Sequence, residues 1–276
     1  MKQQVAIGGS PCTTAIRKTA RIISHKERVM NRQPPATVIS PAKDGSCRQC
    51  ASFGLCHPAG DAGISLARPR HALKKGDYLF RTGDPFRAIY VIQSGCIKTS
   101  MLTGGGDVQV LRFSLPGELV GANAIGSPHH PCDAVALEPT ELCELPFAQL
   151  EQLVREHPQV QHRLLRLLSD EIVLDEKLMA MLGRQKAETR VADFLLNFSQ
   201  RNRQQGSADM PFRLPMSRQD MGDYLGLSLE TISRLLSRFQ ADGLLRVRGR
   251  QVQLRDLARL QSIARLCPEP ILLRSD

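Results

Sequence analysis

The feature that most constrains the fold is a run of helix, glycine turn, helix, glycine and hairpin between residues 215 and 254. Serine is a good N-cap and glycine commonly ends a helix, so the serines and glycines of this run mark the ends of both helices. The complete order is more specific than one amphipathic helix, and it is typical of a winged helix-turn-helix that binds DNA. The expected parts are the N-cap Ser217, a helix over Arg218–Leu225, the turn Gly226-Leu227-Ser228, a helix over Leu229–Asp242, Gly243 and a hairpin over 244–254.

The second of these helices carries the side chains that we expect to read the bases. In a helix-turn-helix, the N-terminal residues of this helix meet base edges in the major groove. Arg234 suits guanine, Glu230 can accept a hydrogen bond from cytosine, and Ser233 can approach a base. Nearby arginines suit phosphate contacts, which position a protein on DNA without specifying sequence. The predicted backbone contacts are Arg218, Arg238, Arg248 and Arg250.

The charge of the chain agrees with a DNA partner. Its 276 residues carry a formal net charge of +10, and the pI is about 9.5. The positive excess lies in residues 1–46 and 183–276, whereas the middle of the chain is slightly acidic. Positive charge favours polyanions because binding releases their counterions.

Four of the eight cysteines form a pattern that suits an inorganic centre. Cys47, Cys50 and Cys56 follow a C-x2-C-x5-C spacing, and Cys143 lies far downstream. Structural zinc sites usually pair two short spacings, so three cysteines plus one distant cysteine favour iron–sulfur ligation. Zinc, and a thiol–disulfide switch without metal, remain the alternatives. We expect Phe53 and Leu55 to shield the centre from solvent.

The sequence also indicates a compartment. No apolar stretch reaches the 18 or more residues that a membrane span needs, and the N-terminus lacks an apolar signal core. We therefore expect a cytoplasmic protein without a membrane partner. In a reducing cytosol, clustered cysteines more often hold metal or do redox work than form structural disulfides.

The middle of the chain has the pattern of an antiparallel β-roll. Short strand-like runs, such as Tyr78–Phe80 and Ala88–Ile92, alternate with glycine-containing turns. Regular spacing of short strands indicates a barrel or a double-sheet roll. The fold class is therefore α+β. The expected parts are a largely disordered extension over 1–46, a cysteine loop over 47–62, a β-roll over 63–157, a dimerisation helix over 158–184 and a winged-helix domain over 185–276.

A heptad repeat in the long helix predicts a homodimer. Apolar residues recur at alternate spacings of four and three, as in the seam of a two-stranded coiled coil. The alternative is a helix that packs only on its own domain. The seam consists of Gln161, Leu165, Leu168, Ile172, Asp175, Met179 and Leu182.

Asp175 is the charged member of this seam. Two copies would face each other across a two-fold axis, where like charges disfavour association. Either Asp175 swings to solvent, or it weakens the dimer so that association needs help from the metal centre. The second hypothesis predicts that Asp175→Ala dimerises without that centre.

These residues resemble the CRP/FNR superfamily of bacterial regulators, and within it the fumarate-and-nitrate-reduction regulators. The resemblance covers roughly residues 47–265. Its most specific parts are the cysteine spacing of 47–56, the turn Pro116-Gly117-Glu118-Leu119-Val120-Gly121 and the stretch Leu229-Glu230-Thr231-Ile232-Ser233-Arg234-Leu235-Leu236. The stretch Cys143-Glu144-Leu145-Pro146-Phe147 is also similar to the family.

The resemblance implies a [4Fe–4S] cluster on Cys47, Cys50, Cys56 and Cys143. In the family, oxygen degrades the cluster and the dimer separates. It also implies that the dimer binds double-stranded DNA with TTGAT-type half-sites and recruits RNA polymerase. The base-reading residues and Asp175 occupy positions that match the family.

Cyclic-nucleotide binding and catalysis are the main rival functions. Nucleotide-binding members resemble one another in an Arg-Ser pair that grips phosphate, but residues 129–134 contain no arginine and Asp133 would repel phosphate. We therefore expect no cyclic nucleotide. The chain also lacks a phosphate-cradling glycine loop of known spacing and an H-E-x-x-H motif, so we expect no enzyme.

Overall fold

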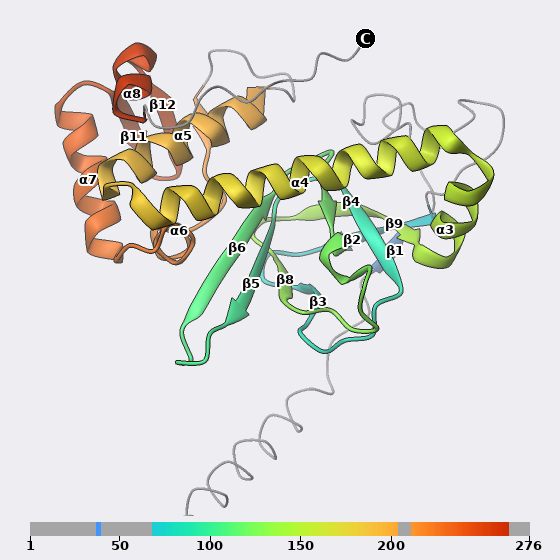
Figure 1. The fold of residues 1–276 in the computed structure, drawn as a ribbon. Helices are drawn as coiled ribbons and strands as arrows, with labels where there is room; N and C mark the ends of the chain where they lie inside the picture. The colour runs from blue at the N-terminus through green and yellow to red at the C-terminus, as the bar shows by residue number, and fades with distance from the viewer. Residues whose placement is uncertain (1–36, 40–67, 204–210, 265–276) are drawn as a thin grey trace, which may run out of the picture. The chain divides into compact units, whose positions relative to one another are not determined.

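The computed structural model describes residues 37–39, 68–203 and 211–264. Figure 1 shows these elements in chain order. The strands are β1 (Thr37–Ile39), β2 (Arg68–Leu73), β3 (Tyr78–Phe80), β4 (Ala88–Ser94), β5 (Ile97–Leu102), β6 (Val108–Ser114), β7 (Leu119–Val120), β8 (Asp133–Ala136), β9 (Thr140–Pro146), β10 (Phe212–Arg213), β11 (Leu245–Arg248) and β12 (Gln251–Leu254). The helices are the short η2 (Ala122–Ala124), α3 (Phe147–Glu156), α4 (Pro158–Arg184), α5 (Ala187–Arg203), α6 (Arg218–Leu225), α7 (Leu229–Ala241) and α8 (Leu257–Ala264).

Nine of these strands form the two sheets of the roll. One sheet has the order β1-β2-β9-β4-β7 and the other β3-β8-β5-β6. The described pairings that carry a register are antiparallel, for example β4 with β9 and β5 with β6. The predicted antiparallel roll is confirmed, and the predicted strands over 78–80 and 88–92 coincide with β3 and the first part of β4.

Strands β4 and β9 are buried on both faces. Side chains alternate across a strand, so Ile89 and Val91 share one face of the sheet with Cys143 and Leu145. This face packs on α3 and α4, where Leu150 and Val160 are fully buried. The face therefore joins the roll to the long helix.

The C-terminal elements form a winged helix-turn-helix whose helix ends follow from local chemistry. The Ser217 side chain accepts a hydrogen bond from the Asp220 amide and completes a capping box, while Gly226 ends α6 with φ 62°. A β-carbon on Gly222 would lie 2.5 Å from the carbonyl oxygen of Leu227, so the tight turn requires glycine there. The helices predicted over 218–225 and 229–242 are confirmed as α6 and α7.

None of the helices in the described part of the chain combines the length and apolarity that a bilayer span requires.

Candidate DNA interface, dimer face and cysteine site

Helix α7 presents the predicted base-reading residues on its outer side. Ser228 caps the helix by accepting a hydrogen bond of 3.2 Å from the Thr231 amide. The apolar side chains on the opposite side are buried, which fixes the rotation of the helix. As a result Glu230 and Arg234 are exposed, and Ser233 is half-buried. The buried residues are Ile232, Leu235, Leu236 and Phe239.

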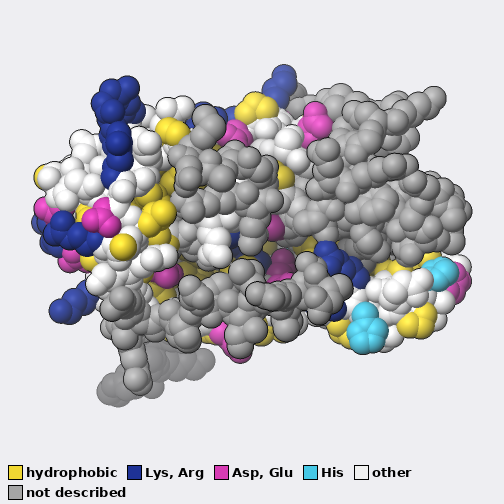
Figure 2. Space-filling model, turned by 90° about the horizontal axis from the view of Figure 1, so that it is seen from above, with side chains coloured by type: hydrophobic (Ala, Val, Ile, Leu, Met, Phe, Trp, Pro, Cys, Tyr) yellow, Lys and Arg dark blue, Asp and Glu magenta, His cyan; other side chains and the backbone are white. Residues whose placement is uncertain are grey.

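The four predicted backbone arginines differ in what they already contact. Arg218 donates a hydrogen bond of 3.2 Å to the Ser233 hydroxyl, so it lies beside one of the predicted base-reading residues. Arg238 pairs with Glu188, and Arg250 donates a hydrogen bond of 2.7 Å to the carbonyl oxygen of Pro215. Arg248 is exposed on β11. Figure 2 shows Lys and Arg side chains projecting from the winged-helix end of the molecule, at the left.

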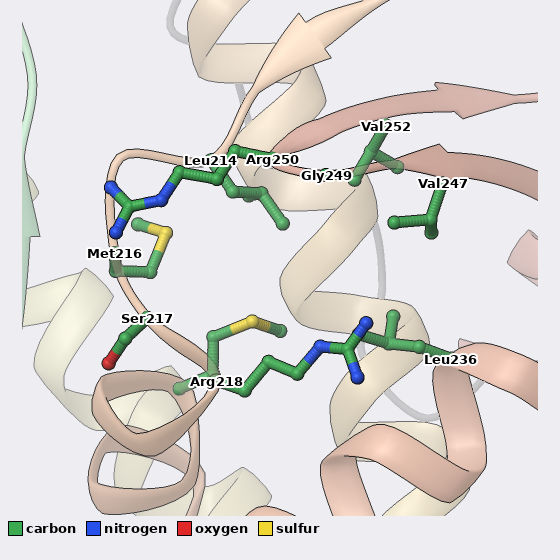
Figure 3. Close-up of a pocket in the computed structure, with 10 residues that line it drawn as sticks. Leu214, Met216, Ser217, Arg218, Leu236, Val247, Gly249, Arg250 and Val252 are labelled. Carbon is green, nitrogen blue, oxygen red and sulfur yellow. The ribbon is translucent and has the colours of Figure 1, made fainter.

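A small cavity lies between α6, α7 and the hairpin β11–β12. Its volume is about 160 Å³, and apolar side chains such as Met216 and Leu236 line it. Figure 3 shows the Arg218 side chain extending across it toward Leu236, while the guanidinium of Arg250 lies beside Met216. Ligand pockets usually measure about 300–1,000 Å³, so we interpret this space as a packing gap behind the DNA-binding surface.

Helix α4 carries two adjacent stripes with different burial. The first stripe packs on its own chain. The second stripe is the predicted seam, and each of its residues directly follows a residue of the first stripe in the sequence. In the first, Val160 is fully buried and Met181 is 4% exposed. In the seam, Ile172 is 59% and Met179 is 65% exposed. The first stripe is Val160, Leu164, Leu167, Glu171, Leu174, Leu178 and Met181, all buried or half-buried.

The seam is exposed at most of its positions. Leu168 and Leu182 are half-buried, whereas Gln161, Leu165 and Asp175 are exposed together with Ile172 and Met179. A helix that packed only on its own domain would leave mainly polar residues outward. Here the outward stripe is apolar over several turns, and this pattern needs a second surface to cover it.

Asp175 already has a partner in the same chain. Arg112 on β6 places Nη2 2.6 Å from Asp175 Oδ1. The carboxylate is therefore not the isolated charge that the sequence suggested.

Cys143 is the one predicted cluster ligand within the described residues. It lies on β9, is 3% exposed, and points to the face of the sheet that packs on α3 and α4. A centre held there would lie beside the partly buried side of α4, near Leu164 and Leu168. This position fits a thiolate ligand that connects a metal centre to the long helix.

The other predicted ligands and shielding residues lie outside the described residues: Cys47, Cys50, Cys56, Phe53 and Leu55. In the described ranges, no group of three His, Cys, Asp or Glu side chains could hold a metal ion. A centre on Cys143 would therefore need ligands from outside the described residues. Cys96 and Cys132 are fully buried, as expected for structural cysteines, and burial raises the pKa of both thiols.

Comparison with known proteins gives the family. The Crp-like helix-turn-helix domain matches residues 189–263, and the cyclic nucleotide-binding domain matches residues 70–157. The chain is 40% identical over 224 residues to the transcriptional activator protein Anr of Pseudomonas aeruginosa, covering 79% of this chain and 92% of the relative. The chain belongs to the CRP/FNR family.

Further members support this assignment. The fumarate and nitrate reduction regulatory protein of Escherichia coli is 40% identical over 79% of this chain and 90% of its own. The structure of FixK2 from Bradyrhizobium japonicum superposes with a TM-score of 0.68 at 32% identity, covering 74% of this chain and 100% of that chain. This CRP/FNR protein is thus a DNA-binding transcription regulator close to FNR, and its relatives are regulators rather than enzymes.

The match to a nucleotide-binding domain concerns the fold of residues 70–157. Glu118, in the glycine-rich acidic turn that such sites share, is held by Arg201 from α5 through hydrogen bonds of 2.9 and 2.6 Å. Asp133 accepts hydrogen bonds from the amide and hydroxyl of Thr82. Residues 129–134 contain no arginine, so the Arg-Ser pair of the nucleotide-binding members is not present in this segment.

Sequence reasoning missed the arginines and the lysine that connect the parts of this CRP/FNR chain. Arg112 contacts α4, Arg201 contacts the roll, and Lys98 lies 2.6 Å from Asp220 on α6. Their partners lie 59 to 122 residues away in the sequence, so no local spacing or period in the sequence predicts these contacts.

Proposed function

We propose that this regulator responds to oxygen and binds palindromic DNA as a homodimer when Cys47, Cys50, Cys56 and Cys143 hold a [4Fe–4S] cluster. The observation that carries the proposal is the position of Cys143 on the sheet face that packs on α4. This position would allow a metal centre to act on the helix that bears the exposed apolar seam. When bound, the cluster supplies a centre that oxygen can attack.

The ligand set rests on the cysteine pattern. Three cysteines within residues 47–56 and one on β9 would draw this segment onto the roll beside α4. Four thiolates also suit tetrahedral zinc, so zinc is the outcome that would replace the cluster. Phe53 and Leu55 would limit the access of solvent and oxygen.

Dimerisation through α4 would give the protein its DNA-binding geometry. The exposed seam, with Ile172 and Met179, offers an apolar surface to a second copy. Paired helices would place two copies of α7 one DNA turn apart, about 34–36 Å, which suits a palindromic site. We infer from the family resemblance that Glu230, Ser233 and Arg234 read TTGAT-type half-sites.

Activation requires contact with RNA polymerase, and relatives named as activators support this role. The hairpin β5–β6 has an exposed tip, with Leu102 59% exposed beside the glycine-rich turn 104–107. We assign the polymerase contact to this tip. The proposal places the protein in the cytoplasm, where DNA and polymerase are found.

The test begins with purification under nitrogen and counts of iron and acid-labile sulfide. About four of each per chain, with a visible spectrum that bleaches in air, would support the cluster. Cys143→Ala should lose the cluster, the anaerobic dimer and DNA binding together. Cys132→Ala, which removes another buried thiol, is the matched control and should keep all three. Zinc without sulfide, or full iron in Cys143→Ala, would contradict the proposal.

A further inference from the structure

Arg112 on strand β6 binds two carboxylates of helix α4. Its Nη2 lies 2.6 Å from Asp175 Oδ1, and its Nη1 lies 3.3 Å from Glu171 Oε1. Nη2 also donates a hydrogen bond of 3.2 Å to the carbonyl oxygen of Glu171. Figure 1 shows α4 passing over the strands of the roll. Glu171 and Asp175 lie four residues apart on this helix, so one arginine fork spans about one helical turn.

The two carboxylates belong to different stripes of α4. Glu171 lies on the stripe that packs on the roll, and Asp175 lies on the seam with its side chain 61% exposed. Burial raises the pKa of Glu171, Arg112 opposes this rise, and Asp175 and Glu118 add to it. Arg112 itself is only 17% exposed, so its position is fixed by packing.

These contacts change the charge that the seam presents. Near the seam each chain carries two negative charges, on Glu171 and Asp175, and one positive charge, on Arg112. Without the arginine, the net negative charge of this part of the helix would double. Like charges near a two-fold axis repel more strongly as the interface excludes water.

We infer that Arg112 is the counter-ion of the dimer seam. It offsets the repulsion between the Asp175 carboxylates of two chains and thereby sets how tightly two α4 helices associate. This inference rests on the proposed dimer. It also revises the hypothesis that Asp175 alone weakens the dimer, because Arg112 already offsets part of that charge.

Arginine suits this role better than lysine. Its planar fork can bind Asp175 and Glu171 at the same time, and it stays charged at any physiological pH. Lysine would keep the charge but could not hold both carboxylates in the same geometry. Arg112→Lys should therefore dimerise less tightly than the wild type and more tightly than Arg112→Gln.

The test measures the dimer dissociation constant of the cluster-loaded protein by sedimentation under nitrogen, at equal iron content. Arg112→Gln should raise this constant about tenfold. Arg112→Gln combined with Asp175→Ala has the same net charge as the wild type, so its constant should return to within about threefold. Arg213→Gln, which removes a 2.9 Å pair with Glu138 away from α4, is the control and should have no effect.

Two results would overturn the inference. One is an Arg112→Gln protein that dimerises like the wild type, and the other is a weakened Arg112→Gln protein that Asp175→Ala does not rescue. If circular dichroism shows that Arg112→Gln does not fold, the dissociation constant of the Asp175→Ala dimer tests the inference by itself. A gain in affinity below about tenfold supports an Asp175 charge that Arg112 already offsets, and a larger gain contradicts it.

The same measurements separate this inference from the proposed function. A wild-type protein that stays monomeric with its cluster loaded contradicts the proposed dimer, and the role of Arg112 falls with it. A wild-type dimer that is indifferent to Arg112→Gln contradicts only the counter-ion role.

Discussion

Lys98 on strand β5 lies 2.6 Å from Asp220, the residue that closes the capping box of helix α6. Asp220 therefore does two things: it satisfies the Ser217 amide at the start of the helix, and it binds the roll. Both side chains are mostly buried, with 19% of Lys98 and 16% of Asp220 exposed. The first helix of the DNA-binding motif is thus attached to the roll through its own cap.

Lys98→Met should weaken the attachment of the winged-helix domain. The change removes a charge-assisted hydrogen bond, and the expected loss in the free energy of unfolding is about 1.5 kcal/mol. Urea denaturation checks this value. Lys75→Met, at an exposed lysine, is the matched control and should leave stability unchanged. Equal stability of both variants would mean that Lys98 contributes nothing to the attachment.

The same carboxylate predicts a dependence on pH. Burial alone would raise the pKa of Asp220, but hydrogen bonds from Lys98 and Ser217 lower it below its ordinary value. A carboxyl group with a lowered pKa contributes stability above its ordinary pKa of about 3.9, and this contribution is lost as the pH falls through the folded-state pKa. Asp220→Asn should therefore be less stable than the wild type at pH 7, and the difference should shrink toward pH 3. A constant difference between pH 7 and pH 3 would exclude the ionised pair as its cause.

A second attachment joins α5 to the roll through Arg201 and Glu118. The guanidinium also donates a hydrogen bond of 2.6 Å to the carbonyl oxygen of Phe113. Removing Arg201 leaves the Glu118 charge largely buried and unpaired. Arg201→Met should therefore lower the free energy of unfolding by about 3 kcal/mol at most, because solvent reaches 18% of the Arg201 side chain and 29% of the Glu118 side chain.

Thermal unfolding checks this prediction, with a double variant as its control. Arg201→Met combined with Glu118→Gln leaves no unpaired charge and should recover part of the loss. A double variant that is as unstable as the sum of the two single variants would show that the two side chains are not coupled.

Local chemistry made the DNA-binding motif predictable from sequence. The N-caps Ser217 and Ser228 and the ends of α6 appear in the structure where the residues placed them, because each depends on neighbours a few positions away. The attachments between parts were not predictable. Lys98 and Asp220 lie 122 residues apart, and only the folded roll brings them together.

The seam of α4 lies between these two cases. The heptad repeat was predictable from the sequence, and the exposed stripe agrees with it. The pairing of Asp175 with Arg112 was not predictable, because a sequence period carries no information about a neighbouring strand. All four cluster ligands stay a prediction, and of these only Cys143 lies in the described residues.

Two arginine substitutions distinguish base contacts from phosphate contacts in the predicted DNA interface. Arg234 is exposed near the N-terminal part of α7, so Arg234→Ala should relax the preference at one guanine and cost about 1–3 kcal/mol there. Arg248 is exposed on the hairpin, so Arg248→Ala should weaken binding to all sequences and lower the salt dependence. Affinities for a panel of single-base variants of one half-site, at two salt concentrations, distinguish the two. Identical specificity profiles would contradict these roles.

The direction of the stability change in Gly222→Ala distinguishes helix propensity from close backbone approach at this position. An alanine in the middle of a helix usually stabilises it relative to glycine by about 1 kcal/mol. At this position, however, the added β-carbon would lie 2.5 Å from the carbonyl oxygen of Leu227, which forces the turn away from α6. Overpacking of this kind costs about 1–3 kcal/mol, so Gly222→Ala should be destabilised overall.

The loss should be confined to the motif. Gly222→Ala should lose affinity for DNA because α7 is displaced relative to α6, while iron content stays normal because Cys143 lies on β9 of the roll. Gly126→Ala is the matched control, since no atom lies within 4 Å of its added β-carbon. A Gly222→Ala protein that is more stable than the wild type would mean that the turn can relax, and that helix propensity rather than close approach governs this position.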